Sequence, residues 1–142
     1  MICIYNRFQK HFGGILCINI LIKQSHGVVP TSMCILYNNC YYIGSEENPY
    51  LVCVGASSSN GTTVTLHPDT KIIAESAFRS VKTVVMYPSV THIGARLFEG
   101  AGTIKYIGTA TDWDAIDKSE NWYLSYYTWH STRSSVVYNY EP

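Results

Sequence analysis

Two stretches of this chain repeat the same order of apolar and small residues at a spacing of twenty positions. Residues 66–80 read LHPDTKIIAESAFRS, and residues 86–100 read MYPSVTHIGARLFEG. A period of 20–50 residues is typical of chains built from stacked similar units, and it constrains the fold more than any local helix or strand pattern does. The 142 residues are therefore predicted to form one domain that contains repeating units.

Fixed columns of apolar and small residues define each unit, while the residues between them vary. The columns are Thr63, Thr83 and Thr103; Val64, Val84 and Ile104; Leu66, Met86 and Tyr106; Ile73, Ile93 and Trp113; Pro68 and Pro88; Ala74 and Gly94; Ala77 and Leu97; and Phe78 and Phe98. Each unit predicts a short strand that ends at the proline, which has no N–H to donate, and a return through an isoleucine and a phenylalanine. Because strand side chains alternate between two faces, Val64 and Leu66 should point inward, where the next unit covers them.

The flanking segments are predicted to close the two ends of the stack. Residues 40–56 carry two β-rich runs around the polar stretch GSEENP, which predicts a β-hairpin, and the hairpin cap is assigned to residues 40–62. The repeats are assigned to residues 63–116, and an aromatic C-terminal cap to residues 117–142. Trp113, at the end of the repeats, should lie across the stack with Trp122 or Trp129 beside it. Residues 1–39 lack the repeat columns and are predicted to be less securely ordered.

Charge and cysteine content exclude several classes of function. Ten basic residues balance ten acidic ones, and charged residues make up 14% of the chain. A chain without net positive charge is not predicted to attract nucleic acid or an anionic membrane. The five cysteines all precede residue 54 without a C-x-x-C, which fits neither a disulfide framework nor a zinc site. The apolar run at residues 15–22 is too short to span a bilayer, and without a clean cleavage site after it a buried strand is preferred to a signal peptide.

No group of side chains predicts a catalytic or metal site. His67 and His92 fall in different columns, so stacking would not bring them together. Asp112 and Asp114 flank Trp113 and would share the opposite face of an extended segment; they are interpreted as solvated, because no acid, base or nucleophile accompanies them. No serine lies in a G-x-S-x-G context. The chain is predicted not to be an enzyme and to need no cofactor.

Residues 40–142 resemble the BspA-like leucine-rich-repeat proteins, whose repeats run close to IP-x-SVT-x-IG-x-x-AF-x-G-C-x-x-L. The stretch YPSVTHIGARLFEG reproduces the SVT-x-IG and F-x-G elements, and IKYIGTATDWDAI is similar to the terminal Y-x-GT-x-x-x-W-x-x-I unit. The chain departs from the pattern at Val81 and Ala101, where the family has cysteine, and in units about three residues shorter than the common family length.

The resemblance implies a leucine-rich-repeat solenoid, β-rich with short irregular or helical returns. It further implies a non-enzymatic interaction or adhesion module of a bacterial surface protein, secreted or held at the cell surface, with a protein or cell-surface ligand as partner.

Solenoids present long regular faces that suit protein recognition, and the exposed strand positions predict where such a face lies. The candidate residues are Thr65, Val85 and Lys105, with His67, Tyr87 and Ile107 beside them. Tyr87 is the expected anchor, because tyrosine is favoured at interface centres. The alternative is a truncated or decayed structural repeat fragment with no ligand of its own, since only two full units and a partial third are present.

Overall fold

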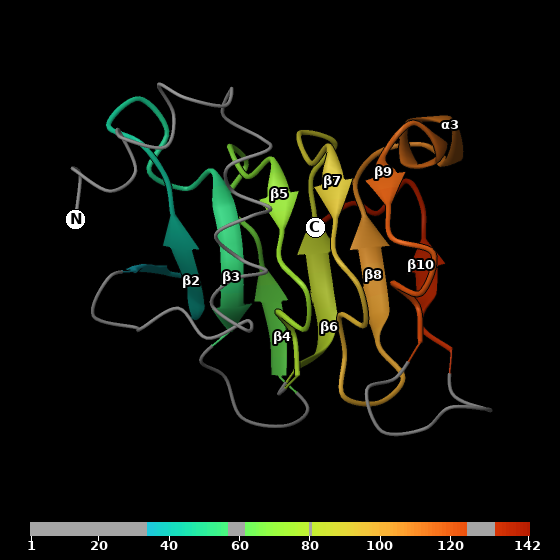
Figure 1. The fold of residues 1–142 in the computed structure, drawn as a ribbon. Helices are drawn as coiled ribbons and strands as arrows, with labels where there is room; N and C mark the ends of the chain where they lie inside the picture. The colour runs from blue at the N-terminus through green and yellow to red at the C-terminus, as the bar shows by residue number, and fades with distance from the viewer. Residues whose placement is uncertain (1–33, 57–61, 80, 125–132) are drawn as a thin grey trace.

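The computed structural model describes residues 34–56, 62–79, 81–124 and 133–142. Within these ranges the strands form two sheets (Figure 1). The six-stranded sheet has the order β1 (Ile35–Tyr37), β2 (Cys40–Ile43), β3 (Val52–Ala56), β5 (Ile72–Ile73), β7 (His92–Ile93) and β9 (Asp117–Lys118). The four-stranded sheet has the order β10 (Ser135–Val137), β8 (Thr103–Tyr106), β6 (Val81–Met86) and β4 (Thr62–Thr65). One short helix, α3 (Ala110–Asp114), lies between β8 and β9 in the described chain.

From β4 to β9 the chain alternates between the two sheets and adds one strand to each in turn. The pairing is parallel and in register at the spacing read from the sequence. Thr63 pairs with Thr83 and Thr83 with Thr103 in one sheet, and Ile73 pairs with Ile93 in the other. The strands follow one another along the molecule in sequence order (Figure 1). The twenty-residue repeat of the sequence is thus also a repeat in space.

The turns that follow β4 and β6 are built the same way. Thr70 N–H donates to the carbonyl of His67 at 3.0 Å, and Val90 N–H donates to the carbonyl of Tyr87 at 3.3 Å. A proline is the second residue of each turn, where its fixed φ suits a β-turn and its missing N–H costs no ladder bond. The prediction that the proline ends the strand is confirmed.

The inward columns fill the space between the sheets. The residues that alternate inward from β4, β6 and β8 are Val64, Leu66, Val84, Met86, Ile104 and Tyr106, and all of them are buried. Phe78 and Phe98 form a parallel bridge with ring centroids 5.7 Å apart, as their shared column predicts. At Gly94 an added Cβ would lie 2.5 Å from the backbone nitrogen of Glu75, so the small residue predicted there allows the two returns to approach closely.

At the N-terminal end, the predicted hairpin is confirmed, but its boundary is not. β2 and β3 pair antiparallel, and β3 pairs parallel with β5, so the hairpin extends the six-stranded sheet beyond the first unit. β1 pairs antiparallel with β2, so Ile35–Tyr37 belongs to the sheet although the sequence assigned it to the segment of uncertain order. The two asparagines between β1 and β2 both have positive φ, which allows the tight turn. The remainder of that segment lies outside the described residues.

At the C-terminal end, the column assigned to Trp113 is wrong. Trp113 lies in α3, and Lys118 is the residue that pairs with Ile93. The helix inserts residues between the two strands of the third unit, so the spacing there is 25 instead of 20. The boundary predicted at residue 116 is also too early, because Asp117–Lys118 continues the six-stranded sheet.

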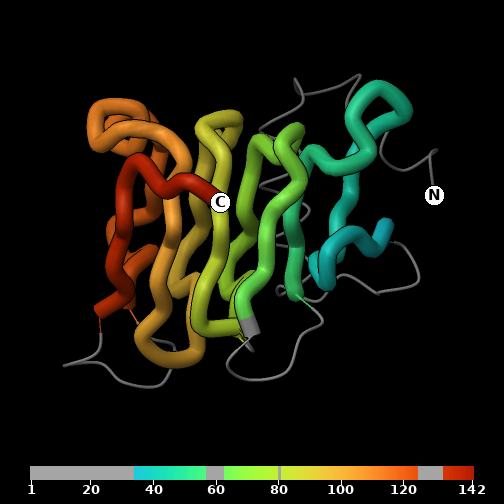
Figure 2. The backbone as a smooth tube through the Cα atoms, turned by 180° about the vertical axis from the view of Figure 1, so that it is seen from behind, coloured from blue at the N-terminus to red at the C-terminus, as the bar shows by residue number. Residues whose placement is uncertain are grey.

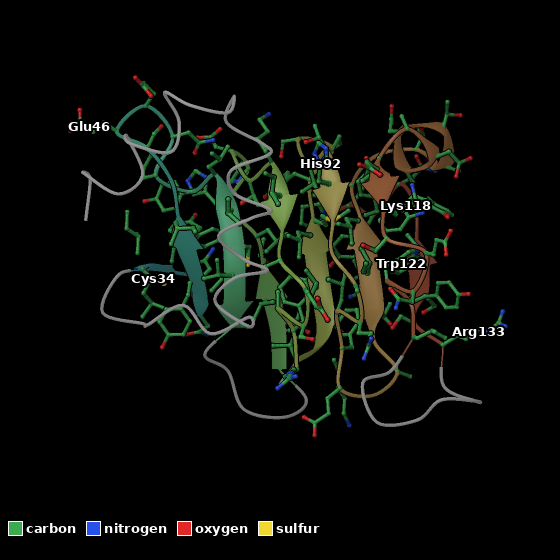
Figure 3. The ribbon with its side chains drawn as sticks, viewed as in Figure 1. Cys34, Glu46, His92, Lys118, Trp122 and Arg133 are labelled. Atoms are coloured by element: carbon green, nitrogen blue, oxygen red, sulfur yellow. The ribbon has the colours of Figure 1, made fainter. Side chains whose placement is uncertain are left out.

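The end of the stack is nevertheless closed by aromatic rings, as predicted. The ring of Trp113 packs edge-to-face against Trp122 at 5.2 Å, and Lys118 and Trp122 lie at the same end of the molecule (Figure 3). The Lys118 ammonium donates to the carbonyls of Trp113 at 2.6 Å and Ile116 at 2.7 Å, at the C-terminal end of the helix. Burial lowers the pKa of this ammonium. Trp129 lies outside the described residues.

Helix α3 starts with a capping box. The Thr109 hydroxyl accepts a hydrogen bond from the Asp112 N–H at 3.2 Å, and the Asp112 carboxylate accepts one from the Thr109 N–H at 2.8 Å. Hydrogen bonds from the Thr109 side chain and backbone hold the pKa of Asp112 below its ordinary value. Asp112 is therefore a capping residue. Residues 110–114 are helical, so the geometry considered for an extended segment does not apply, and Asp112 and Asp114 are both exposed.

Replacing Thr109 with alanine should lower the free energy of unfolding by about 1 kcal/mol, because the helix loses its N-cap acceptor. Urea unfolding followed by tryptophan fluorescence measures the change, with Thr111→Ala, an exposed position of the same helix, as the control. Since the pKa of Asp112 is lower in the folded state than in the unfolded state, Asp112 adds to the free energy of unfolding at pH values above its unfolded pKa. This stabilisation should be lost as the pH falls through the folded pKa. A Thr109→Ala chain as stable as the Thr111→Ala control would contradict the cap.

No helix in the described ranges is long and apolar enough to cross a bilayer.

Candidate binding face

The predicted face lies on the outer side of the four-stranded sheet, which Figure 2 views from outside. Thr65 pairs with Val85, and Val85 pairs with Lys105, so these three side chains stand side by side across β4, β6 and β8. Their neighbours along each strand point inward to the core. The strand part of the predicted face is therefore brought together by the fold.

The structure adds a fourth strand that sequence reasoning missed. β10 pairs parallel with β8, so that Val137 is opposite Lys105 and Ser135 is opposite Thr103. The hydroxyl oxygens of Ser135 and Thr103 are 3.3 Å apart. The spacing between these partners is 32 residues, so a search at a period of twenty could not find the strand. The run of β-branched and aromatic residues at 136–138 was the available signal. In the structure Val136 packs against the core while Ser135 and Val137 are exposed.

Val85 was predicted to be exposed, and this is wrong: only 4% of its surface is accessible. The segment that follows β10 lies on this outer face (Figure 2). Asn139 has a φ of 52°, which turns the chain back, and its N–H donates to the Gly108 carbonyl at 3.0 Å. Tyr140 N–H donates to the Tyr106 carbonyl at 3.0 Å. The end of the chain then lies beside β6 in both Figure 1 and Figure 2, over the strand that carries Val85.

Lys105 is the charged residue of the face, and the same segment engages it. The Lys105 ammonium lies 4.6 Å from the centroid of the Tyr140 ring, within the range of a cation–π interaction. Lys105 is half-buried, and Glu141, which follows Tyr140 in the chain, is exposed. The chain's own C-terminal segment, residues 138–142, thus occupies part of the predicted binding face.

His67 does not lie on the face as predicted. Its ring stacks on Tyr50 with centroids 3.7 Å apart and an interplanar angle of 12°, and it meets Tyr37 edge-to-face at 4.8 Å. The backbone N–H of His67 donates to the Tyr42 hydroxyl at 3.0 Å. These four side chains form the N-terminal aromatic cluster, which packs the hairpin against the first unit. Sequence reasoning could not foresee this, because Tyr50 comes from a separate segment.

Tyr87 and Ile107 follow β6 and β8 and are both half-buried. The Ile107 N–H donates to the Met86 carbonyl at 3.0 Å, which keeps the segment after β8 beside the one after β6. These two residues therefore lie at the edge of the outer face, near Lys105. Of the six candidates, strand pairing brings Thr65, Val85 and Lys105 together, and Val85 among them is buried.

Three cysteines lie in the hairpin region, and all are thiols. Cys40 and Cys53 are buried, and their side chains form a hydrogen bond that lowers the pKa of Cys40. Burial raises the pKa of Cys53 well above its ordinary value, and burial also raises that of Cys34. A thiol held in the neutral form inside a core is inert, so Cys53 is structural. The two earlier cysteines lie outside the described residues.

Among the described residues, the remaining polar side chains do not converge on a reactive centre. His92 lies 3.6 Å from the Asp117 carboxylate across β7 and β9 and 2.8 Å from the Thr91 hydroxyl, at an exposed edge. The Thr91 hydroxyl donates to the Lys71 carbonyl, so its hydrogen is not directed at a base. In the parts of the chain that the structure describes, no group of three or more His, Cys, Asp or Glu side chains could hold a metal ion.

No family model, curated protein or solved structure matches the chain.

Proposed function

We propose that the chain is a BspA-like leucine-rich-repeat solenoid and a non-enzymatic interaction module, which binds a protein or cell-surface ligand through the outer face of its four-stranded sheet. The observation that carries the proposal is the register of outward side chains across β4, β6, β8 and β10. A row of this kind offers a flat, ordered surface whose composition is free to vary, because the inward columns alone hold the core.

The size of the face sets the strength of binding that it can support. Neighbouring strands lie about 4.8 Å apart, so four strands span roughly 14 Å, and the face is smaller than a standard protein interface. A ligand is therefore bound weakly or transiently, with a dissociation constant on the order of micromolar. Exposure at the cell surface or after secretion is part of the proposal, since adhesion modules act there.

A second function class remains because Val85 is buried and Lys105 is engaged by Tyr140 of the same chain. A structural fragment without a ligand would leave its outer face closed in this way. The two proposals differ in whether substitutions on the face change binding without changing stability.

The test is an array of cell-surface and extracellular-matrix proteins probed with the purified chain. We expect at least one ligand to be retained, and its affinity to fall at least tenfold with Tyr87→Ala or Lys105→Ala, which remove an aromatic anchor and a cation from the face. Lys71→Ala, an exposed lysine outside this face, is the matched control and should bind as the parent does. No ligand at all favours the structural fragment, and a ligand that all variants bind equally contradicts the proposed face.

A further inference from the structure

The segment that follows β10 is held on the outer face by a small number of contacts. Its backbone donates to the carbonyls of Gly108 and Tyr106, and the Tyr140 ring lies against the Lys105 ammonium. Glu141 and Pro142 are exposed. The segment leaves the sheet at the left-handed Asn139, so it does not continue the ladder of β10 and can lift away without breaking that strand.

The place that this segment takes is the most distinctive part of the face. Val85 supplies a buried apolar contact on β6, and Lys105 supplies a cation next to it on β8. The π-face of an aromatic ring attracts the ammonium, as the Tyr140 ring does 4.6 Å from Lys105. The body of such a ring also suits the apolar surroundings of Val85 on the neighbouring strand.

We propose that this part of the face is a docking site for an extended peptide that carries an aromatic residue, and that residues 138–142 occupy it as an internal competitor. This inference rests on the proposed function and specifies its partner. A partner segment with an aromatic residue in the place of Tyr140 replaces the ring contact with Lys105. A nucleic acid is a poor fit, since the site offers a single lysine and no array of cations.

Tethering gives the internal segment its advantage. A short linker holds it at an effective concentration in the millimolar range, so a free peptide of equal intrinsic affinity competes poorly. The apparent affinity for an external peptide is reduced by the fraction of molecules in which the site is open. Removing the segment should therefore strengthen binding without adding any contact.

The test measures binding of the labelled peptide VVYNYEP, which is residues 136–142 of this chain, by fluorescence anisotropy. A chain that ends at Tyr138, and so keeps β10, should bind the peptide at least tenfold more tightly than the full chain does. The same peptide with alanine in place of Tyr140 should bind at least tenfold more weakly to the shortened chain. In the shortened chain, Lys105→Ala should abolish binding and Lys71→Ala should not.

Circular dichroism and the thermal midpoint establish that the shortened chain is folded. If it is not, the full chain with Tyr140→Ala, which keeps the backbone of the segment, replaces it and should bind the peptide more tightly than the parent. The inference is overturned if the opened, folded chain binds the peptide no better than the parent, or if the alanine peptide binds equally well. In that case a ligand found on the array and lost with Lys105→Ala would still uphold the proposed function, so the two failures are distinct.

Discussion

Phe98→Ala should lower the free energy of unfolding by about 3–5 kcal/mol, the usual cost of removing a buried phenylalanine ring from a core. The ring is 1% exposed and packs against Phe78 in the neighbouring unit. On its other side, an added Cβ at Gly102 would lie 2.3 Å from the Phe98 ring, so the backbone itself forms part of the wall. Rigid backbone on one side and a ring on the other leave little room for collapse into the cavity.

Urea unfolding followed by tryptophan fluorescence measures this loss. Since a small domain is stable by only about 5–15 kcal/mol, the variant should be partly unfolded near physiological temperature. Phe98→Leu keeps most of the volume and should cost much less, and Leu36→Ala, at a side chain that is 58% exposed on β1, should be near neutral. If the free energy of unfolding of Phe98→Ala lies within about 1 kcal/mol of the parent's, the shared interior column of Phe78 and Phe98 does not stabilise the fold as expected.

The columns could be read from the sequence because each one is imposed by stacking. An inward residue such as Val84 contacts its counterparts one unit before and one unit after, so its apolar character must recur at the same spacing. The outward residues carry no such constraint, and their surroundings depend on other segments. Val85 is buried, and the segment that lies on the same face after reversing at Asn139 is far along the chain, so no local pattern at Val85 predicts its surroundings.

The third unit was misread for a different physical reason. Parallel pairing of Ile93 with Lys118 needs only that the two strands meet, and the loop between strands can lengthen without disturbing it. Helix α3 uses that freedom, and its capping residues Thr109 and Asp112 form a T-x-x-D pattern that marks a helix start. A fixed period of twenty placed Trp113 in the column instead. The T-x-x-D helix start at Thr109, and not the twenty-residue period, therefore decides where Trp113 lies.

The second large effect is expected at the C-terminal end of the stack. Residues 117–142 complete both sheets, because β9 pairs with β7 and β10 pairs with β8. They also supply the carbonyls of Asn121 and Trp122, which accept hydrogen bonds at 3.2 Å from the N–H groups of Arg96 and Leu97. Without these residues, the last unit presents an open strand edge on each sheet.

Deleting residues 117–142 should make the remaining chain aggregate, and any soluble fraction should have a thermal midpoint lower by on the order of 10 °C. Trp113 loses its contact with Trp122 and the capping ammonium of Lys118, so an indole that is 4% exposed becomes part of an uncovered apolar end. Apolar surface and unpaired strand edges together recruit other chains. Size-exclusion chromatography with light scattering and a thermal melt measure both consequences.

The chain that ends at Tyr138 is the matched control, because it keeps β9 and β10 and removes only the segment on the outer face. It should remain monomeric with a thermal midpoint close to that of the parent, since the core contacts of Trp113, Lys118 and Val136 are all retained. A soluble chain of residues 1–116 that unfolds cooperatively at the parent's midpoint would contradict the capping role. The aromatic residues near the C-terminal end would then have no capping role. They would become candidates for ligand contact, next to the outer face of the four-stranded sheet that carries Lys105.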